Sequence, residues 1–144
     1  MPIREAVQLL NEGRCCAVWK DGQTIFSDGI GVKPLLDFLR QDRQFLKGAS
    51  VADRVVGKAA ALLLVYGGAK EVYGRLMSET AVAVLKKYKI SYSFGERVPF
   101  IKNRRGDGMC PLEQAVVGID DPEDGFAAIM QRVAEMMNIA RATE

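Results

Sequence analysis

The sequence predicts a single α/β domain, in which helices pack on the faces of a mixed β-sheet. Segments with the two-residue alternation typical of strands are separated by segments with the apolar spacing typical of helices. The 144 residues, of which 49% are hydrophobic and 26% charged, suit one compact domain. No repeat, linker or low-complexity segment divides the sequence, so we expect residues 1–144 to form one domain.

The first part of the chain predicts a helix followed by a β-hairpin. Residues 3–11 carry apolar side chains at the spacing of a short amphipathic helix. The runs 15–20 and 23–28 are rich in β-forming residues. Asp21-Gly22 lies between them, and this dipeptide is the strongest short-range signal for a two-residue hairpin turn.

Two consecutive helices are predicted next. Pro34 begins a helix that extends to about residue 47, with leucines along one stripe. Ser50 and Asp53 have the spacing of a capping box, which predicts a second helix over residues 50–66. Because apolar residues lie on nearly every side of this second helix, we expect it to be the central buried helix.

The second half of the chain is predicted to alternate strands and helices. Residues 70–77 predict a strand, and Ser78 caps a helix that ends near residue 87. Residues 90–94 and 98–102 predict a second hairpin, with its turn at Gly95. A short helix and then a longer one, ending near residue 140, complete the chain.

Composition and charge exclude several function classes. The 20 basic and 18 acidic residues are scattered along the chain and leave a net charge of +2, which gives no electrostatic basis for nucleic-acid or membrane binding. No apolar run approaches the ~20 residues of a membrane span, and the N-terminus lacks the layout of a signal peptide. Cys15, Cys16 and Cys110 form no disulfide framework, which indicates reduced thiols and a cytoplasmic protein.

Three segments of the sequence resemble one protein family. LKGASVADRVVGKAAALLLVYGGAKEVYG, NRRGDGMCPLEQAV and IDDPED are similar to a bacterial domain-of-unknown-function family, number 1893. The resemblance spans roughly residues 10–126, nearly the whole chain. It implies a cytidine-deaminase-like fold, which is a three-layer α/β/α sandwich around a mixed sheet, and it implies no settled activity.

Zinc-dependent deamination is nevertheless the chemistry that the sequence most firmly excludes. Zinc deaminases carry H-x-E at one helix N-terminus and P-C-x-x-C at a second. This chain has no His, neither helix start predicted at Ser50 and Ser78 contains Cys, and Cys110 alone cannot build the site. We therefore expect no metal and no cofactor, but still a crevice toward which two helix N-termini point.

Asp53 and Gly57 are the first candidates for that crevice. On the predicted helix they share one face, and a glycine inside a helix costs about 1 kcal/mol relative to Ala, so it needs a reason. The functional interpretation is a pocket floor with Asp53 as acceptor or general base; the alternative is a helix cap and close packing. Lys58 lies about 140° around the helix from Asp53. Ser78 and Glu79 fit either helix capping or a ligand.

The irregular stretch 103–113 is the best functional candidate. Arg104 and Arg105 precede a glycine-rich turn that ends at a helix N-terminus, an arrangement that binds anions. The alternative is a surface loop with solvated arginines. Cys110 lies at the helix start, where a thiolate is stabilised, whereas Glu113 opposes a second negative charge. The alternative for Cys110 is a small buried residue under the loop.

Two function classes therefore stay open. One is a ligand-binding module, or an enzyme of unidentified class, that holds a small anionic or nucleotide-like molecule in the degenerate deaminase crevice. The other is a non-catalytic structural or protein-interaction domain, in which the methionines of the last helix support packing or self-association. The candidate ligand-binding residues are Asp53, Gly57, Lys58, Ser78, Glu79, Arg104, Cys110 and Glu113.

Overall fold

The centre of the molecule is a five-stranded mixed sheet with the strand order β2-β1-β3-β4-β5. The computed structural model describes residues 2–29, 31–103 and 105–142. β1 (Cys16–Lys20) pairs antiparallel with both β2 (Gln23–Ser27) and β3 (Ser50–Val56). β4 (Glu71–Ser78) and β5 (Ser91–Val98) continue the sheet in parallel from β3. The predicted α/β class with a mixed sheet is therefore confirmed.

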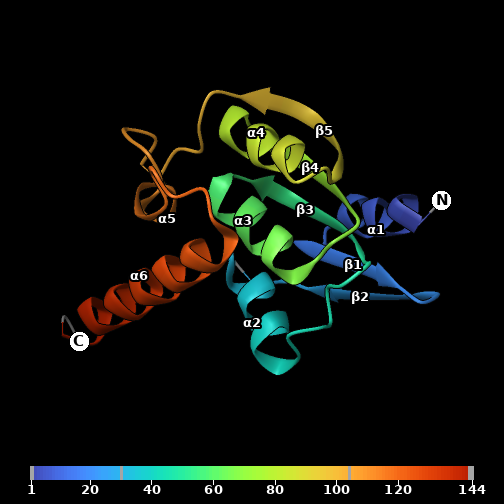
Figure 1. Ribbon diagram of the computed structural model, residues 1–144, viewed down its shortest axis with the longest axis horizontal. Helices are drawn as coiled ribbons and strands as arrows, with labels where there is room; N and C mark the ends of the chain where they lie inside the picture. The colour runs from blue at the N-terminus through green and yellow to red at the C-terminus, as the bar shows by residue number, and fades with distance from the viewer. Residues whose placement is uncertain (1, 30, 104, 143–144) are drawn as a thin grey trace.

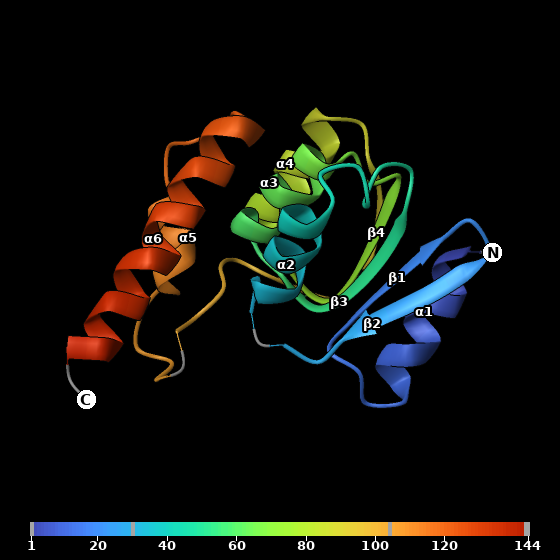
Figure 2. The ribbon, with the colours of Figure 1, turned by 90° about the horizontal axis from the view of Figure 1, so that it is seen from below.

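Helices lie on both faces of this sheet (Figures 1 and 2). α1 packs against β1 and β3 on one face, whereas α2, α3 and α4 cover the other. α5 and α6 pack outside α3 as a further layer on that second side. The helices are α1 Pro2–Asn11, α2 Lys33–Gln41, α3 Lys58–Gly67, α4 Glu79–Lys87, α5 Pro111–Ala115 and α6 Pro122–Ala142.

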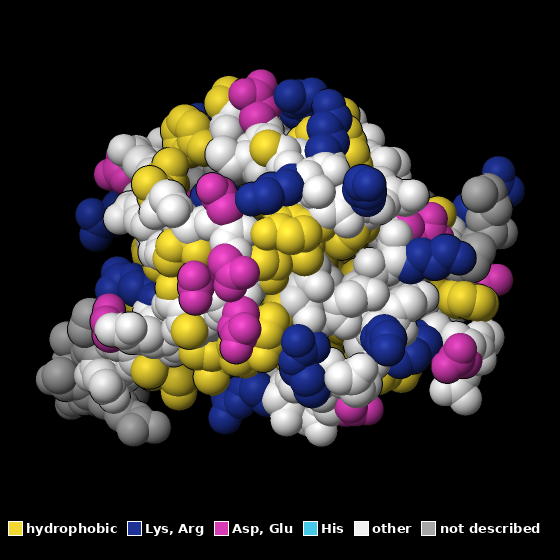
Figure 3. Space-filling model, in the orientation of Figure 1, with side chains coloured by type: hydrophobic (Ala, Val, Ile, Leu, Met, Phe, Trp, Pro, Cys, Tyr) yellow, Lys and Arg dark blue, Asp and Glu magenta, His cyan; other side chains and the backbone are white. Residues whose placement is uncertain are grey.

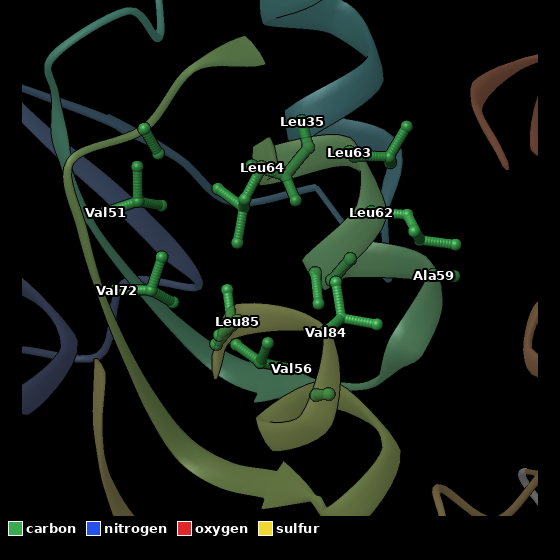
Figure 4. Packing of buried hydrophobic residues seen from close by; sticks show 14 of the residues in the cluster. Leu35, Val51, Val56, Ala59, Leu62, Leu63, Leu64, Val72, Val84 and Leu85 are labelled. Atoms are coloured by element: carbon green, nitrogen blue, oxygen red, sulfur yellow. The ribbon is translucent and has the colours of Figure 1, made fainter. Parts of the chain in front are cut away.

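The main core is built around α3. Leu64 lies toward Val51 and Val72 of the sheet, whereas Leu62 is on the opposite side of the helix (Figure 4). That opposite side is covered by α6, where a Cβ at Gly125 would lie 2.9 Å from Leu62 Cδ1. Because neighbours surround α3, apolar residues occupy nearly its whole circumference. The prediction of a central buried helix is confirmed for this segment.

The first hairpin forms as predicted. Asp21 and Gly22 have φ angles of 51° and 81°, and a type I′ turn requires positive φ at both central residues. The strand over 70–77, the helix capped by Ser78, and the two last helices also form close to their predicted bounds. Acidic and basic side chains intermingle over the surface in Figure 3, as the scattered charges predict. No described helix could cross a membrane.

The helix predicted to begin at Ser50 is wrong, because residues 50–56 form the central strand β3. Asp53 therefore lies in a strand, and Gly57 is the residue that precedes α3. A strand buried between two neighbours shows a near-continuous apolar run instead of simple alternation. Here that run continues directly into the buried helix, so periodicity alone could not separate them.

The turn predicted at Gly95 is also wrong, because β5 is one continuous strand. Gly95 serves close backbone approach within the sheet: a Cβ there would lie 2.8 Å from the carbonyl oxygen of Arg75. The helix predicted from Pro34 to residue 47 is shorter, ending at Gln41, since Asp42 adopts an extended conformation with φ −152°.

Candidate functional site

Three helices begin at the end of the sheet where strands β2, β3, β4 and β5 have their carboxyl ends. β2 and β3 are both antiparallel to β1, so they run in the same direction, and β4 and β5 run parallel to β3. α3 follows β3 after one residue, α4 follows β4 directly, and α2 follows β2 after residues 28–32, so the three helices begin at the carboxyl ends of these strands. Helix N-termini present unpaired amides and partial positive charge, which favours anions at this edge.

At the start of α3 the anion position is occupied by the chain's own carboxylate, Glu113. Its Oε1 accepts from the amide of Lys58 at 2.7 Å, and its Oε2 accepts from the amide of Ala59 at 2.8 Å. Glu113 is only 7% exposed. It therefore joins α5 to the first turn of α3 through two charge-assisted hydrogen bonds.

Gly57 provides the space for that carboxylate. A Cβ at position 57 would overlap Oε1 of Glu113, and it would lie 2.8 Å from Cγ1 of Ile101. The φ angle of Gly57 is −96°, so the backbone conformation is open to any residue. Gly57 is thus required for close approach by Glu113, and the predicted shared helix face with Asp53 does not exist.

Burial raises the pKa of Glu113 above its ordinary value. The amides of Ala59 and Lys58, and then the positive charge of Lys58, lower it in part. These opposing effects have one geometric origin, because the same buried contact that removes water also supplies the donors.

Asp53 lies inside the sheet, not in an open crevice. It is 6% exposed and sits between Cys16 of β1 and Gly74 of β4. Its Oδ2 has no hydrogen-bond partner among the described residues. Burial raises its pKa to about 7, whereas the amides of Arg54 and Val55 lower it. Burial, and next the Asp53 carboxylate, also raise the pKa of the Cys16 thiol well above its usual value.

An open groove of about 250 Å³ lies next to the start of α3, along one side of α4. Lys58 enters it from α3 with its side chain only 14% exposed, and Nζ lies 3.5 Å from Oδ1 of Asp120. Asp120 is 70% exposed, and its carbonyl accepts from the hydroxyl of Tyr88 at 2.9 Å. The groove is lined by Lys58, Thr80, Ala83, Val84, Lys87 and Asp120.

Of the predicted site residues that the structure describes, Lys58 alone lines this groove. Thr80 and Lys87 were missed, although their separation of seven residues places them on one face of a helix. Asp120 was missed because its pairing with Lys58 depends on tertiary structure. Glu79 is instead 3.9 Å from Arg97 in an exposed ion pair.

Hydrogen bonds within the segment before α5 connect Asn103 to Gly106 and Asp107. Oδ1 of Asn103 accepts from the amide of Gly106 at 2.8 Å, and Nδ2 of Asn103 donates to Asp107 at 2.9 Å. Cys110 is half-buried at the start of α5, where its amide donates to the carbonyl of Ile101 at 2.9 Å. Arg104, a predicted ligand-binding residue, lies outside the described residues.

The described side chains do not fit a zinc site. No group of three or more His, Cys, Asp or Glu in 2–29, 31–103 and 105–142 could hold a metal ion, and the sequence contains no His. A catalytic zinc needs three such ligands together with water.

Comparison with known proteins identifies the family. The family model described as a domain of unknown function, DUF1893, matches residues 5–133. The chain belongs to the DUF1893 family. It is also similar to the crystal structure of a DUF1893 family protein from Thermotoga maritima, with 28% identity and a TM-score of 0.83 over 91% of this chain and 89% of that one. No curated protein matches the chain.

The DUF1893 family is described as a domain of unknown function, so membership assigns no activity to this chain. Ser78 is fully buried, and its Oγ accepts from the amide of Ala81 at 3.1 Å. Its hydroxyl also bonds that of Thr80 at 2.9 Å, which connects the cap of α4 to the groove. Capping therefore accounts for Ser78.

We expect Ser78→Ala to lower the free energy of unfolding by about 1 kcal/mol, because the amide of Ala81 loses its acceptor at a helix N-terminus. Urea denaturation followed by circular dichroism measures this change. Lys86→Ala, at an exposed position of the same helix, is the control and should leave stability nearly unchanged. Equal effects of the two substitutions would contradict the capping role.

Proposed function

We propose that this DUF1893 protein binds a small anionic ligand in the groove along α4. The observation that carries the proposal is the pairing of Lys58 with Asp120. The Lys58 side chain is only 14% exposed, and a cation with little access to water favours an anionic partner. Here that partner is an exposed carboxylate in a turn, and a ligand anion can replace it without disturbing the core.

The other groups in the groove suit an organic anion of small size. Lys87 supplies a second cation and Thr80 supplies a hydroxyl, while Ala83 and Val84 form an apolar surface between them. Cations fix the acidic group of a ligand, and apolar side chains cover its carbon skeleton. At about 250 Å³ the groove suits a compact phosphate or carboxylate compound, and a nucleotide would extend beyond it.

We also propose that the chain has a cytidine-deaminase-like fold. A cytidine-deaminase-like arrangement is supported by the mixed sheet, by helices on both of its faces, and by helix N-termini gathered at the carboxyl edge. Ligands of open α/β sheets bind at that edge. A cytoplasmic location is supported by the three free cysteines.

A second candidate function is a protein-interaction domain. The far part of α6 extends beyond the rest of the molecule (Figure 2), and Met136 and Met137 are exposed there. Exposed methionines are common at binding surfaces. The protein-interaction function is favoured over the ligand-binding function if no anion binds in the groove.

Thermal unfolding with inorganic phosphate, pyrophosphate, citrate and adenosine monophosphate tests the anion site. A ligand that binds only the folded state stabilises it by about 3 kcal/mol at a hundredfold excess over Kd. We expect at least one of these anions to raise Tm, and Lys58→Met to abolish the increase. Lys70→Met, at the exposed residue before the amino end of β4, is the control and should keep the increase. A flat response to all four anions overturns the proposal.

Asp120 competes with the ligand in this proposal. We expect Asp120→Asn to tighten binding of the responding anion by about tenfold, because Lys58 then lacks its carboxylate partner. Isothermal titration calorimetry at fixed salt measures the change in Kd. Asp107→Asn, in the loop before α5, should leave Kd unchanged. Weaker binding in Asp120→Asn would show that Asp120 assists the ligand.

A further inference from the structure

β5 is an exposed edge strand. It has eight residues, and no strand in the described part of the chain pairs with its outer edge. Most of its side chains are exposed, including Phe94 at 37%. Figure 1 shows no helix beyond β5 on the side away from β4. The outer backbone amides and carbonyls of β5 are therefore available to another strand.

β5 lacks several of the features that protect edge strands, although it carries the charged residues Glu96 and Arg97. Proteins usually protect an edge by making it short, or by placing Lys or Pro in it. β5 contains neither residue type. The opposite edge, β2, has only five residues, and the guanidinium of Arg14 lies 4.0 Å from the ring centroid of Phe26. The two edge strands thus differ in length and in how far neighbouring side chains cover them.

We propose that β5 pairs antiparallel with β5 of a second copy of this chain, which joins two sheets into one across a two-fold axis. The register centred on Phe94 is self-complementary. It places Phe94 opposite Phe94, Tyr92 opposite Glu96, and Ser91 opposite Arg97. Aromatic pairs stabilise adjacent strands, and the hydroxyl of Tyr92 can donate to the carboxylate of Glu96.

Three other symmetric registers are less favourable. A register centred on Glu96 places two carboxylates opposite each other, and one centred on Arg97 does the same for two guanidinium groups. Like charges directly opposite each other are destabilising. A register centred on Gly95 places Phe94 opposite Glu96 and leaves the glycines without a side-chain contact. Of these four registers, the one centred on Phe94 avoids opposed like charges and brings two aromatic rings together.

A second copy suits this edge better than an extended peptide of another protein. Peptides that add a strand to a sheet are selected by pockets that receive alternate side chains. The groove along α4 and a shallow hollow between α1 and β2 both lack lining residues from β5. Another β5 supplies complementary side chains in the register centred on Phe94.

Sedimentation-velocity ultracentrifugation over a range of concentrations tests the dimer. We expect the wild-type protein to be dimeric and Phe94→Lys to be monomeric at the same concentrations. Phe26→Lys, an exposed aromatic residue on the other edge, is the matched control and should remain dimeric. Circular dichroism verifies that each variant is folded. A monomeric wild type, or a folded and dimeric Phe94→Lys, overturns the proposal.

The register has its own test. Phe94→Cys should form an intermolecular disulfide under mild oxidation, because residues directly opposite in an antiparallel pair bring their Cα atoms within about 6 Å. Phe100→Cys, outside β5, should not cross-link above the level of the wild type, which keeps its own cysteines. Equal cross-linking of the two variants overturns the proposed register.

Discussion

Gly57→Ala is expected to lower the free energy of unfolding by about 3 kcal/mol. The added methyl group would overlap the carboxylate of Glu113 and press on Ile101. Overpacking costs about 1–3 kcal/mol, and displacement of Glu113 leaves two buried amides at the start of α3 without an acceptor. Urea denaturation measures the effect. Gly108→Ala is the control, because its nearest non-local atom would be Asn103 Nδ2 at an ordinary 3.5 Å.

The coupling between Gly57 and Glu113 makes this test specific. Glu113→Ala alone is also expected to destabilise the protein, because the amides of Lys58 and Ala59 lose their acceptor. In the double variant the methyl group at position 57 no longer meets a carboxylate, so the combined cost should be smaller than the sum. Additive costs would contradict the account of Gly57.

The second large effect concerns pH and Asp53. Burial in the folded protein raises the pKa of the Asp53 carboxyl to about 7, compared with its ordinary value of 3.8. Folding therefore takes up a proton between these values, and the free energy of unfolding falls as pH rises from about 4 to about 7. The fall amounts to roughly 4 kcal/mol and levels off at higher pH. Burial of Glu113, whose pKa is also raised, adds a fall of the same sign.

Asp53→Asn removes the ionisation and should reduce this pH dependence. At pH 8 the variant is expected to exceed the wild type in stability by roughly 2 kcal/mol, after the cost of a buried amide with unpaired donors. At pH 4 it should show no advantage. Urea denaturation at each pH gives both values. Asp37→Asn, an exposed partner of Lys33, is the control and should follow the wild-type profile within about 0.5 kcal/mol. An unchanged profile in Asp53→Asn would contradict the buried, protonated state.

Local chemistry in the sequence predicts much of the fold. Asp21-Gly22 specifies its turn because few dipeptides accept positive φ at both positions. Ser78 specifies a helix start because its hydroxyl accepts from a nearby amide. β3 was not predicted, because a strand buried between two neighbours merges with the apolar helix that follows it. Its identity depends on pairing partners distant in sequence.

The candidate site was predicted less well than the fold. The sequence indicates that Gly57 needs a structural reason and makes Lys58 a candidate, but the partner of each lies elsewhere in the chain. Position 57 requires a glycine because Glu113 lies against it, and Lys58 forms an ion pair with Asp120. These contacts join residues more than fifty positions apart, and neither spacing nor periodicity encodes such distances. The capping-box spacing of Ser50 and Asp53 was misleading because it also fits a strand.

The most direct test of the anion site is a titration of the isotopically labelled protein with pyrophosphate, followed by amide NMR at constant salt. The proposed groove predicts saturable shifts at Lys58, Thr80, Lys87 and Asp120. Lys70, before the amino end of β4, should not move. Shifts confined to the loop of residues 105–109, or no saturable shift at any residue, would contradict the proposed site.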